Sequence, residues 1–257
     1  MKVYGVNSVL EAIKAGKASK IYLAREAKKV KKVKSPKITS IESKAKKAGI
    51  PVVYVPRSTL PAESKGVAAD VTPIKYMDFD YIIEKALREG SFILILDGVE
   101  DPHNLGACLR SAEFFGCAGV LIPKRRAAQV TEAVVRVSAG AALHVDVARE
   151  ENLASAVKKL KKLGFHVIGA EVGGEELWNV SFSPPVAIVI GGEDKGISRP
   201  VRKQVDVIAS IPGYGRIESL NLSVAAGIFM YEFARTQRSE QVRGLQKAVK
   251  GKNGKEG

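Results

Sequence analysis

Short runs of apolar residues separated by amphipathic stretches dominate the chain from about residue 92 onward. Five mainly apolar, strand-like runs occur at 92–96, 120–122, 166–170, 186–190 and 207–211. Such runs are typical of strands that are buried on both faces. Helical periodicity is clearest between them, at 105–115, 151–163 and 221–235. Strands alternating with helices predict an α/β domain whose parallel sheet is covered on both sides.

The beginning of the chain predicts a second, smaller α/β module. Ser8 and Glu11 have capping-box spacing, which predicts a helix that starts there and ends near Gly16. Further elements are a strand at 21–24, a very basic stretch at 28–37, a helix at 38–47 and strands at 51–55 and 66–71. The predicted organisation is a module at 1–71, a linker at 72–77, an α/β domain at 78–240 and a basic, disordered tail at 241–257.

Charge is distributed unevenly along the 257 residues, whose formal net charge is +14. Residues 1–71 carry 16 Lys and Arg against 5 Asp and Glu, a net +11, and residues 239–257 carry 5 against 2. Between these ends, 20 basic and 20 acidic residues cancel. A Lys-rich surface that only keeps a protein in solution would spread both signs along the chain. Basic ends around a neutral domain instead favour a polyanionic partner, which the module at 1–71 is expected to bind.

Composition excludes several other classes of protein. The chain is 46% hydrophobic and 26% charged, as globular domains are, and its aliphatic runs are far shorter than the ~20 residues that span a bilayer. The charged amphipathic N-terminus predicts a cytoplasmic protein with no membrane partner. The three histidines lack metal-ligand spacing, and two cysteines are too few for a zinc site, so no metal is expected. Cys108 and Cys117 are interpreted as small buried or half-buried side chains.

Candidate chemistry lies in the loops after three predicted strands, because α/β sheets bind ligands at the carboxyl ends of their strands. The first loop, at 97–106, leads into a helix that carries Arg110. The second loop is glycine-rich, at 191–196, and the third, at 212–221, opens the last helix. None of them has dinucleotide-binding or P-loop spacing.

Each candidate residue also has a purely structural interpretation. Asn104 would cap a helix, and Arg110 would form a surface ion pair with Glu113. Ser219 and Asn221 would cap the final helix, and the glycines of the second loop would be turn residues. Three polar, glycine-rich loops at three strand ends of one sheet nevertheless favour a shared site.

The sequences around these loops resemble the three ordered motifs of the SpoU, or TrmH, branch of the SPOUT RNA methyltransferases. The motifs are DGVEDPHNLGACLRSAEFFG at 97–116, IVIGGEDKGIS at 188–198 and IPGYGRIESLNLSVAAGIFMYE at 211–232. IPKRRAAQVTEAVVRVSAGAA at 122–142 also resembles the family, and VYGVNSVLEAIKAG at 3–16 is similar to the start of its ribosomal-protein-like substrate-binding domain. Within the family, the likeness is greatest to the large-subunit rRNA guanosine 2′-O-methyltransferases, the RlmB group.

The resemblance implies an α/β-knot domain with a deep trefoil knot in its C-terminal part. Sequence patterns alone do not predict a knot, because chain connections are normally unknotted. The resemblance also implies S-adenosyl-L-methionine held in the knot, and a homodimer with the active site near the subunit interface. The residues that match cofactor-contacting positions of the family are Gly191, Ile211 and Leu220. Those that match its catalytic and substrate-proximal positions are Asn104, Arg110, Glu193, Ser219 and Asn221.

The implied reaction is methylation of a ribose 2′-hydroxyl in structured RNA, with a guanosine of 23S rRNA as the favoured target. A guanidinium holds its proton tightly, which favours a role for Arg110 in gripping phosphate and orienting the ribose. Two alternatives stay open: the same chemistry on tRNA, and a non-catalytic RNA-binding or ribosome-assembly protein. The basic tail has no counterpart in the family's pattern.

Overall fold

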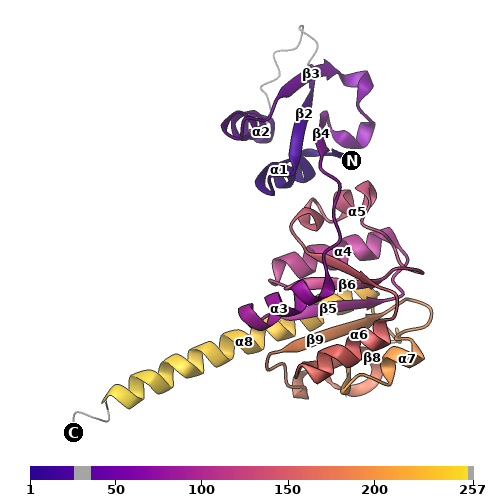
Figure 1. The fold of residues 1–257 in the computed structure, drawn as a ribbon, viewed down its shortest axis with the longest axis vertical. Coiled ribbons are helices and arrows are strands. Elements are labelled where there is room, and N and C mark those ends of the chain that lie inside the picture. Colours follow the sequence, from indigo (N-terminus) through magenta and orange to yellow (C-terminus); the bar gives the residue numbers. More distant parts are fainter. Residues whose placement is uncertain (26–35, 254–257) are drawn as a thin grey trace. The chain divides into compact units, whose positions relative to one another are not determined.

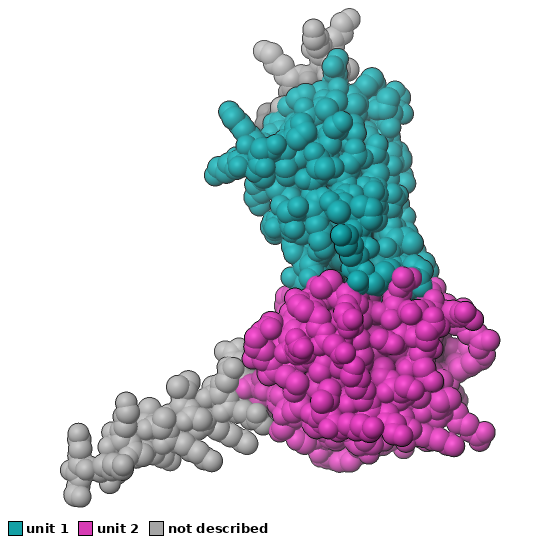
Figure 2. Space-filling view, in the orientation of Figure 1, with its two compact units in different colours: residues 1–76, 101–113, 128–145 teal, residues 77–100, 114–127, 146–257 magenta. Residues whose placement is uncertain are grey.

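The computed structural model describes the backbone of residues 1–25 and 36–253, and the side chains of residues 1–25 and 38–237. The chain forms two compact units, coloured separately in Figure 2. The first contains residues 1–76, 101–113 and 128–145, and the second contains residues 77–100, 114–127 and 146–257. The predicted basic stretch at 28–37 lies almost wholly outside the described residues.

The first unit contains a four-stranded sheet with the order β1-β4-β2-β3 (Figure 1). Its strands are β1 (Lys2–Tyr4), β2 (Ala18–Arg25), β3 (Val52–Pro56) and β4 (Val67–Val71). β4 pairs antiparallel with β1 and β2, whereas β2 and β3 are parallel. The other elements up to β4 are the helices α1 (Val6–Lys14) and α2 (Pro36–Lys47) and the 3-10 turns η1 (Arg57–Thr59) and η2 (Ala62–Ser64). The predicted strands and helices are confirmed, and β1 is an additional short edge strand.

The first helix begins earlier than the capping box predicts, so that prediction is wrong. α1 follows Gly5, whose φ of 91° suits glycine, and no side chain caps the helix. Ser8 lies buried in its first turn, while Glu11 forms an ion pair with Lys14 and a hydrogen bond with His144. The physical reason is that the Gly5 N–H donates to a β4 carbonyl at 3.0 Å, which fixes the turn three residues before the serine.

Three later elements complete the first unit: α4 (Pro102–Phe114, in this unit up to residue 113), α5 (Glu132–Val137) and the turn η3 (Ala141–Leu143). α5 contacts β1, and η3 contacts α1. The backbone N–H of Lys2 donates to Glu132 Oε1 at 2.7 Å, and Lys17 Nζ donates to the Leu143 carbonyl at 2.5 Å. The compact unit therefore extends beyond the predicted front module, which ends at residue 71.

The second unit is built on a six-stranded, wholly parallel sheet with the order β10-β8-β9-β5-β6-β7 (Figure 1). The strands are β5 (Phe92–Asp97), β6 (Gly119–Pro123), β7 (Val147–Glu150), β8 (His166–Glu176), β9 (Val186–Gly191) and β10 (Val207–Ser210). The helical elements are α3 (Phe79–Glu89), α6 (Leu153–Lys162), η4 (Leu177–Asn179), α7 (Arg199–Arg202) and α8 (Leu222–Asn253). All five predicted strands are confirmed. Sequence reasoning missed β7 and α3, although Asp78 caps α3 by accepting the Asp80 N–H at 2.8 Å.

The central strand β5 shows why its apolar run is unbroken. Ile93 and Ile95 belong to a buried cluster with residues of α3, α6 and α7. Phe92 lies on the opposite side of the strand, where its ring contacts Phe233 of α8 with 4.8 Å between the ring centroids. Both faces of the strand are therefore covered within this unit, which leaves no position for a solvated polar side chain.

The end of the chain differs from the sequence prediction. We expected disorder from Gln241, but α8 continues to Asn253. Between Gly244 and Gly251 the segment LQKAVK consists mainly of helix-favouring residues, so local propensity outweighs a composition rich in glycine and lysine. No helix in the described part of the chain is long and apolar enough to cross a membrane.

Asp206 provides a test of the packing around β8. Its Oδ2 accepts the Val167 N–H at 2.9 Å, and its Oδ1 lies 2.7 Å from Lys161 Nζ. Burial alone would raise the pKa of Asp206, but the hydrogen bonds from Lys161 and Val167 and the charge of Lys161 outweigh it, so the pKa is lowered. The ionised carboxylate therefore stabilises the folded protein at any pH above the pKa that Asp206 has in the unfolded chain. This stabilisation is lost as the pH falls through the lower pKa of Asp206 in the folded protein.

We therefore expect Asp206→Asn to lower the free energy of unfolding by about 1 kcal/mol at neutral pH. The difference from the wild type should shrink below about pH 4, where the carboxylate of the unfolded chain is protonated. Urea unfolding at several pH values measures both effects. Glu151→Gln, at the exposed Glu151–Lys124 pair, is the matched control and should change stability little. A pH-independent loss for Asp206→Asn would contradict the assignment.

Candidate active site

The order of the parallel sheet reverses between β5 and β9, at the kind of boundary where α/β sheets bind ligands. The two strands pair in register as far as Asp97 and Gly191. Beyond this pair, the Gly192 N–H donates to the Asp97 carbonyl at 2.9 Å, and the Ser198 N–H donates to Asp97 Oδ2 at 2.7 Å. Asp97 therefore holds both ends of the segment 191–198, which we call the glycine loop.

The glycine loop is folded so tightly that its first two residues have no room for a side chain. A Cβ on Gly191 would lie 2.0 Å from the carbonyl carbon of Gly196 and 2.3 Å from the Ile197 nitrogen. A Cβ on Gly192 would lie 2.5 Å from the Gly98 carbonyl oxygen. These two glycines therefore allow one backbone segment to pack directly on another, a role beyond that of ordinary turn residues. The same loop carries Glu193, whose side chain is exposed.

The third predicted loop leaves β10 at the same edge of the sheet, because all six strands are parallel. Ile211 is half-buried, whereas Ser219 and Leu220 are exposed. Asn221 caps α8, since its Oδ1 accepts the Ser223 N–H at 2.9 Å and the Ser223 hydroxyl at 2.6 Å. The structural interpretation of Asn221 as a cap is therefore correct, and its side-chain oxygen is engaged by the helix.

Asn104 lies on α4, in the first unit, and is not the cap of that helix. The carboxylate of Asp101 accepts the His103 N–H at 3.1 Å and the Asn104 N–H at 3.3 Å. Asn104 is inside the helix and only 6% exposed, so its interpretation as a cap is wrong. The sequence contained the correct signal, because Asp101 followed by Pro102 is typical of a helix start.

Arg110 lies on the same helix with its side chain exposed. Within the described residues its guanidinium forms no hydrogen bond or ion pair, so the structure does not show the pairing with Glu113. Six residues at about 100° each turn the Asn104 and Arg110 side chains about 120° apart around α4. One of these side chains is accordingly buried and the other exposed. An unpaired guanidinium suits a carboxylate or phosphate partner.

Asp97 is the residue of this edge that sequence reasoning missed. The available signal was a single acidic residue that ends the otherwise apolar run FILILD immediately before a glycine. Because Asp97 belongs to β5 and its partner Ser198 lies 101 residues later, no local pattern identifies the contact.

The cysteines and metal-type residues offer no chemistry of their own in the described part of the chain. Burial raises the pKa of the Cys108 and Cys117 thiols to about 12, so both are protonated at neutral pH. The described residues contain no group of three or more His, Cys, Asp and Glu side chains that could hold a metal ion.

Comparison with protein families connects this arrangement to known proteins. Residues 91–231 match the SpoU rRNA Methylase family, and residues 2–77 match the RNA 2′-O ribose methyltransferase substrate-binding family. The two matches together span both compact units.

Individual relatives agree with the family matches. An uncharacterized tRNA/rRNA methyltransferase of Archaeoglobus fulgidus is 54% identical over 74% of this chain and 82% of its own length. A putative TrmH family tRNA/rRNA methyltransferase of Bacillus subtilis, YacO, is 42% identical over 74% of this chain and 80% of its own. The SpoU methyltransferase AviRb of Streptomyces viridochromogenes, solved with the cofactor AdoMet, has the same fold, with a TM-score of 0.75 at 24% identity over 93% of this chain and 91% of its own.

The chain belongs to the SpoU family of RNA methyltransferases. The predicted α/β fold is confirmed: a domain with a parallel sheet follows a substrate-binding domain, and the sheet domain matches solved SpoU methyltransferases. The trefoil knot stays a prediction.

The glycine loop gives a direct test of this site. We expect Gly191→Ala to lower the free energy of unfolding by about 1–3 kcal/mol, because the new Cβ meets rigid backbone. Gly213→Ala is the matched control in the third loop, since a Cβ there has no neighbour within 4 Å. Urea unfolding of the two variants measures the difference. Equal stability of the two variants would show that the glycine loop is not packed as described.

Proposed function

We propose that the protein transfers a methyl group from S-adenosyl-L-methionine to a ribose 2′-hydroxyl of structured RNA, with a guanosine of 23S rRNA in the cytoplasm as its target. The observation that carries this proposal is the glycine loop, held by Asp97 at the switch point of the sheet. The family matches of the two parts of the chain supply the reaction class and the kind of substrate.

The edge of the sheet fits a cofactor with a flat, partly apolar ring system. We assign the backbone groups of Gly191 and Ile211 to hydrogen bonds with the cofactor. The side chain of Leu220, which is 49% exposed, is assigned to pack on its ring system. Tyr214 and Ile217 in the same loop are 91% and 86% exposed. Large uncovered apolar side chains are expected where a ligand or a partner covers them. When bound, S-adenosylmethionine supplies a methyl group on a positively charged sulfur, which is a good leaving group.

The residues of this chain contribute mainly by orienting the ribose for in-line attack of its 2′-oxygen on the methyl carbon. The carbon–sulfur bond would break as the carbon–oxygen bond forms, and the hydroxyl proton would pass to solvent. Asn104, Ser219 and Asn221 are neutral, so they place no net charge beside the cationic sulfur. Arg110 grips an RNA phosphate and thereby positions the ribose, because arginine keeps its proton at neutral pH and this side chain is exposed. Glu193, exposed on the glycine loop, completes the substrate-proximal set.

An apolar patch supports assembly into a homodimer. Val224 and Tyr231 lie seven residues apart on α8, which places them on one helix face, and they are 51% and 55% exposed. The Tyr231 ring also contacts Phe115, with 6.4 Å between centroids, and the neighbouring Phe114 is 79% exposed. Uncovered apolar surface of this kind fits a second copy of the chain. We assign the patch to the subunit interface near the active site.

Val224→Glu tests that assignment. A two-fold interface would bury the new charge twice, so we expect the dissociation constant of the dimer to rise about 100-fold or more. Light scattering over a concentration series measures it. Leu87→Glu is the matched control, because Leu87 is similarly exposed, at 47%, on α3. A dimer that tolerates Val224→Glu as well as Leu87→Glu would place the interface elsewhere.

Arg110→Ala tests the site itself. We expect methyl transfer to fall at least about 100-fold, because the ribose loses its positioning contact, while RNA affinity changes only a few-fold. Arg88→Ala, an exposed arginine on α3, is the control. If RNA binding were lost as completely as activity, Arg110 would be an anchor for RNA and its assignment would be wrong.

The substrate is tested by mapping 2′-O-methylation with mass spectrometry on rRNA and tRNA transcripts treated with the enzyme and labelled cofactor. Methylated guanosine in rRNA is the expected result. Methylation confined to tRNA would correct the substrate. RNA binding without any methylated ribose would identify a non-catalytic RNA-binding protein.

A further inference from the structure

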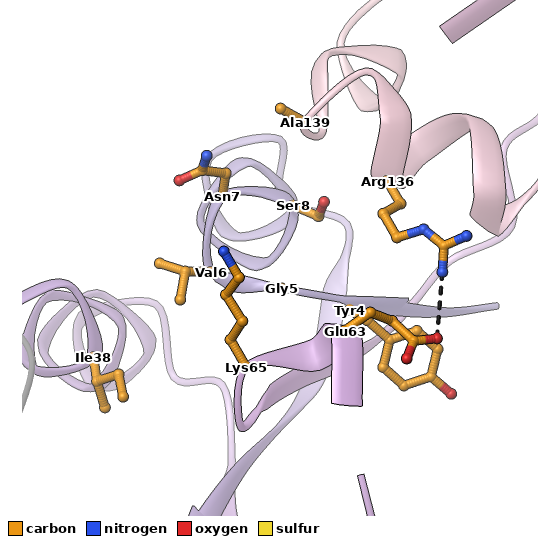
Figure 3. A pocket seen from close by; sticks show the side chains of 10 residues that line it. All are labelled: Tyr4, Gly5, Val6, Asn7, Ser8, Ile38, Glu63, Lys65, Arg136 and Ala139. Carbon is orange, nitrogen blue, oxygen red and sulfur yellow. Dashed lines mark hydrogen bonds and ion pairs between the residues drawn. The ribbon is translucent and has the colours of Figure 1, made fainter. Parts of the chain in front are cut away.

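A cavity of about 500 Å³ opens in the first unit at the start of α1 (Figure 3). Its lining includes Gly5, Asn7, Ser8, Lys65 and Arg136. These residues come from the first turn of α1, the segment before β4, and α5. None of them belongs to the site described above, and we call this cavity the α1 pocket.

The backbone at the α1 pocket presents unsatisfied donors. The N–H groups of Val6, Asn7 and Ser8 have no acceptor among the described residues, and Gly5 brings no side chain to cap them. The partial positive charge of a helix N-terminus adds to these donors and favours an anion. Helix starts of this kind are common and do not by themselves form a ligand site.

Ser8 provides the second observation. It is only 3% exposed, it lines the pocket, and its hydroxyl has no hydrogen-bond partner among the described residues. Figure 3 shows this hydroxyl pointing away from the axis of α1, on the side of Arg136 and Ala139. The Ser8 Oγ atom is not among the fully buried polar atoms without a partner, so it keeps access to the pocket that its residue lines. A ligand in the pocket would supply the missing partner.

The charges around the pocket also favour an anion. Lys65 and Arg136 are cationic, and Glu63 is the one carboxylate of the lining, 3.5 Å from the Arg136 guanidinium. Lys65 and Ala139 have positive φ values of 50° and 54°, a conformation that non-glycine residues rarely adopt. Such conformations concentrate at ligand sites, where the surrounding structure holds them in place.

We propose that the α1 pocket binds a phosphodiester group of the RNA substrate. The three backbone N–H groups and the Ser8 hydroxyl donate to its oxygens, and Lys65 and Arg136 neutralise its charge. The cavity volume is in the range of sites that hold a whole small molecule, so a nucleotide with its sugar fits it better than a free phosphate ion. The choice of RNA as the source of the phosphate rests on the proposed function.

The first experiment tests for the anion site without RNA or methyl transfer. The full-length protein, labelled with ¹⁵N, is titrated with inorganic phosphate at constant ionic strength, with chloride as the reference. The amide signals of residues 6–8 should shift in the wild type and shift much less in Ser8→Ala. An absence of shifts at these amides would overturn the proposal even if the enzyme methylates RNA.

The second experiment tests RNA as the source of the phosphate. Ser8→Ala should weaken RNA binding about tenfold, the size expected for a hydrogen bond to a charged group. The same variant should leave the thermal midpoint of the free protein unchanged or slightly raised, because the Ser8 hydroxyl has no hydrogen-bond partner among the described residues. Ser43→Ala, an exposed serine on α2, is the matched control and should change neither quantity. A lowered midpoint for Ser8→Ala would indicate a structural hydroxyl and overturn the proposal.

The charged residues of the pocket are tested by salt dependence. In Lys65→Gln the slope of log affinity against log salt should fall by about 0.7–0.9, the value for one phosphate contact. Lys158→Gln, an exposed lysine on α6, should leave the slope unchanged. One outcome would overturn the RNA assignment. In it, phosphate shifts the amide signals, but the pocket variants bind RNA with unchanged affinity and unchanged salt dependence, so the site binds only free phosphate. Pocket effects on RNA binding without methyl transfer would support the pocket while refuting the proposed reaction.

Discussion

The carboxylate at the end of the central strand fixes the glycine loop at the carboxyl edge of the sheet. Through Asp97, the chain at residue 198 is fixed to the chain at residue 97, and the glycine loop between β9 and α7 closes against backbone from both sides. Gly191 and Gly192 are required because that closure leaves no volume for a side chain. The loop is therefore shaped by one long-range hydrogen bond and two steric constraints. These contacts fix the backbone at both ends of the loop, and a fixed geometry is what catalysis by positioning needs.

How far the sequence could predict this molecule depends on whether the information is local. The five buried strands were predictable, because a strand covered on both faces must be apolar throughout. Contacts between distant residues were not. The Ser8–Glu11 spacing predicts a capping box, but the Gly5 hydrogen bond to β4 moves the helix start and leaves Ser8 inside the first turn. The role of Asp97 was hidden for the same reason, since its partner lies on another loop.

The boundary between the two family matches in the sequence does not coincide with the boundary between the two compact units. Residues 128–145 fall within the SpoU match, yet they pack against the front module, where Glu11 accepts from both Lys14 and the His144 ring. Burial alone would raise the pKa of Glu11, but these two partners outweigh it and lower the pKa. A segment of the catalytic sequence is thus part of the same packed body as the basic front module.

The two cysteines have a consequence for where and how this protein can work. Thiolates are the form that oxidants, electrophiles and soft metals attack, and a thiol with a pKa near 12 supplies almost none at physiological pH. Cys117 also donates from Sγ to the Gly119 carbonyl at 3.1 Å, which ties the thiol to the start of β6. Both thiols are therefore expected to react slowly with oxidants and electrophiles compared with a cysteine whose thiolate is populated.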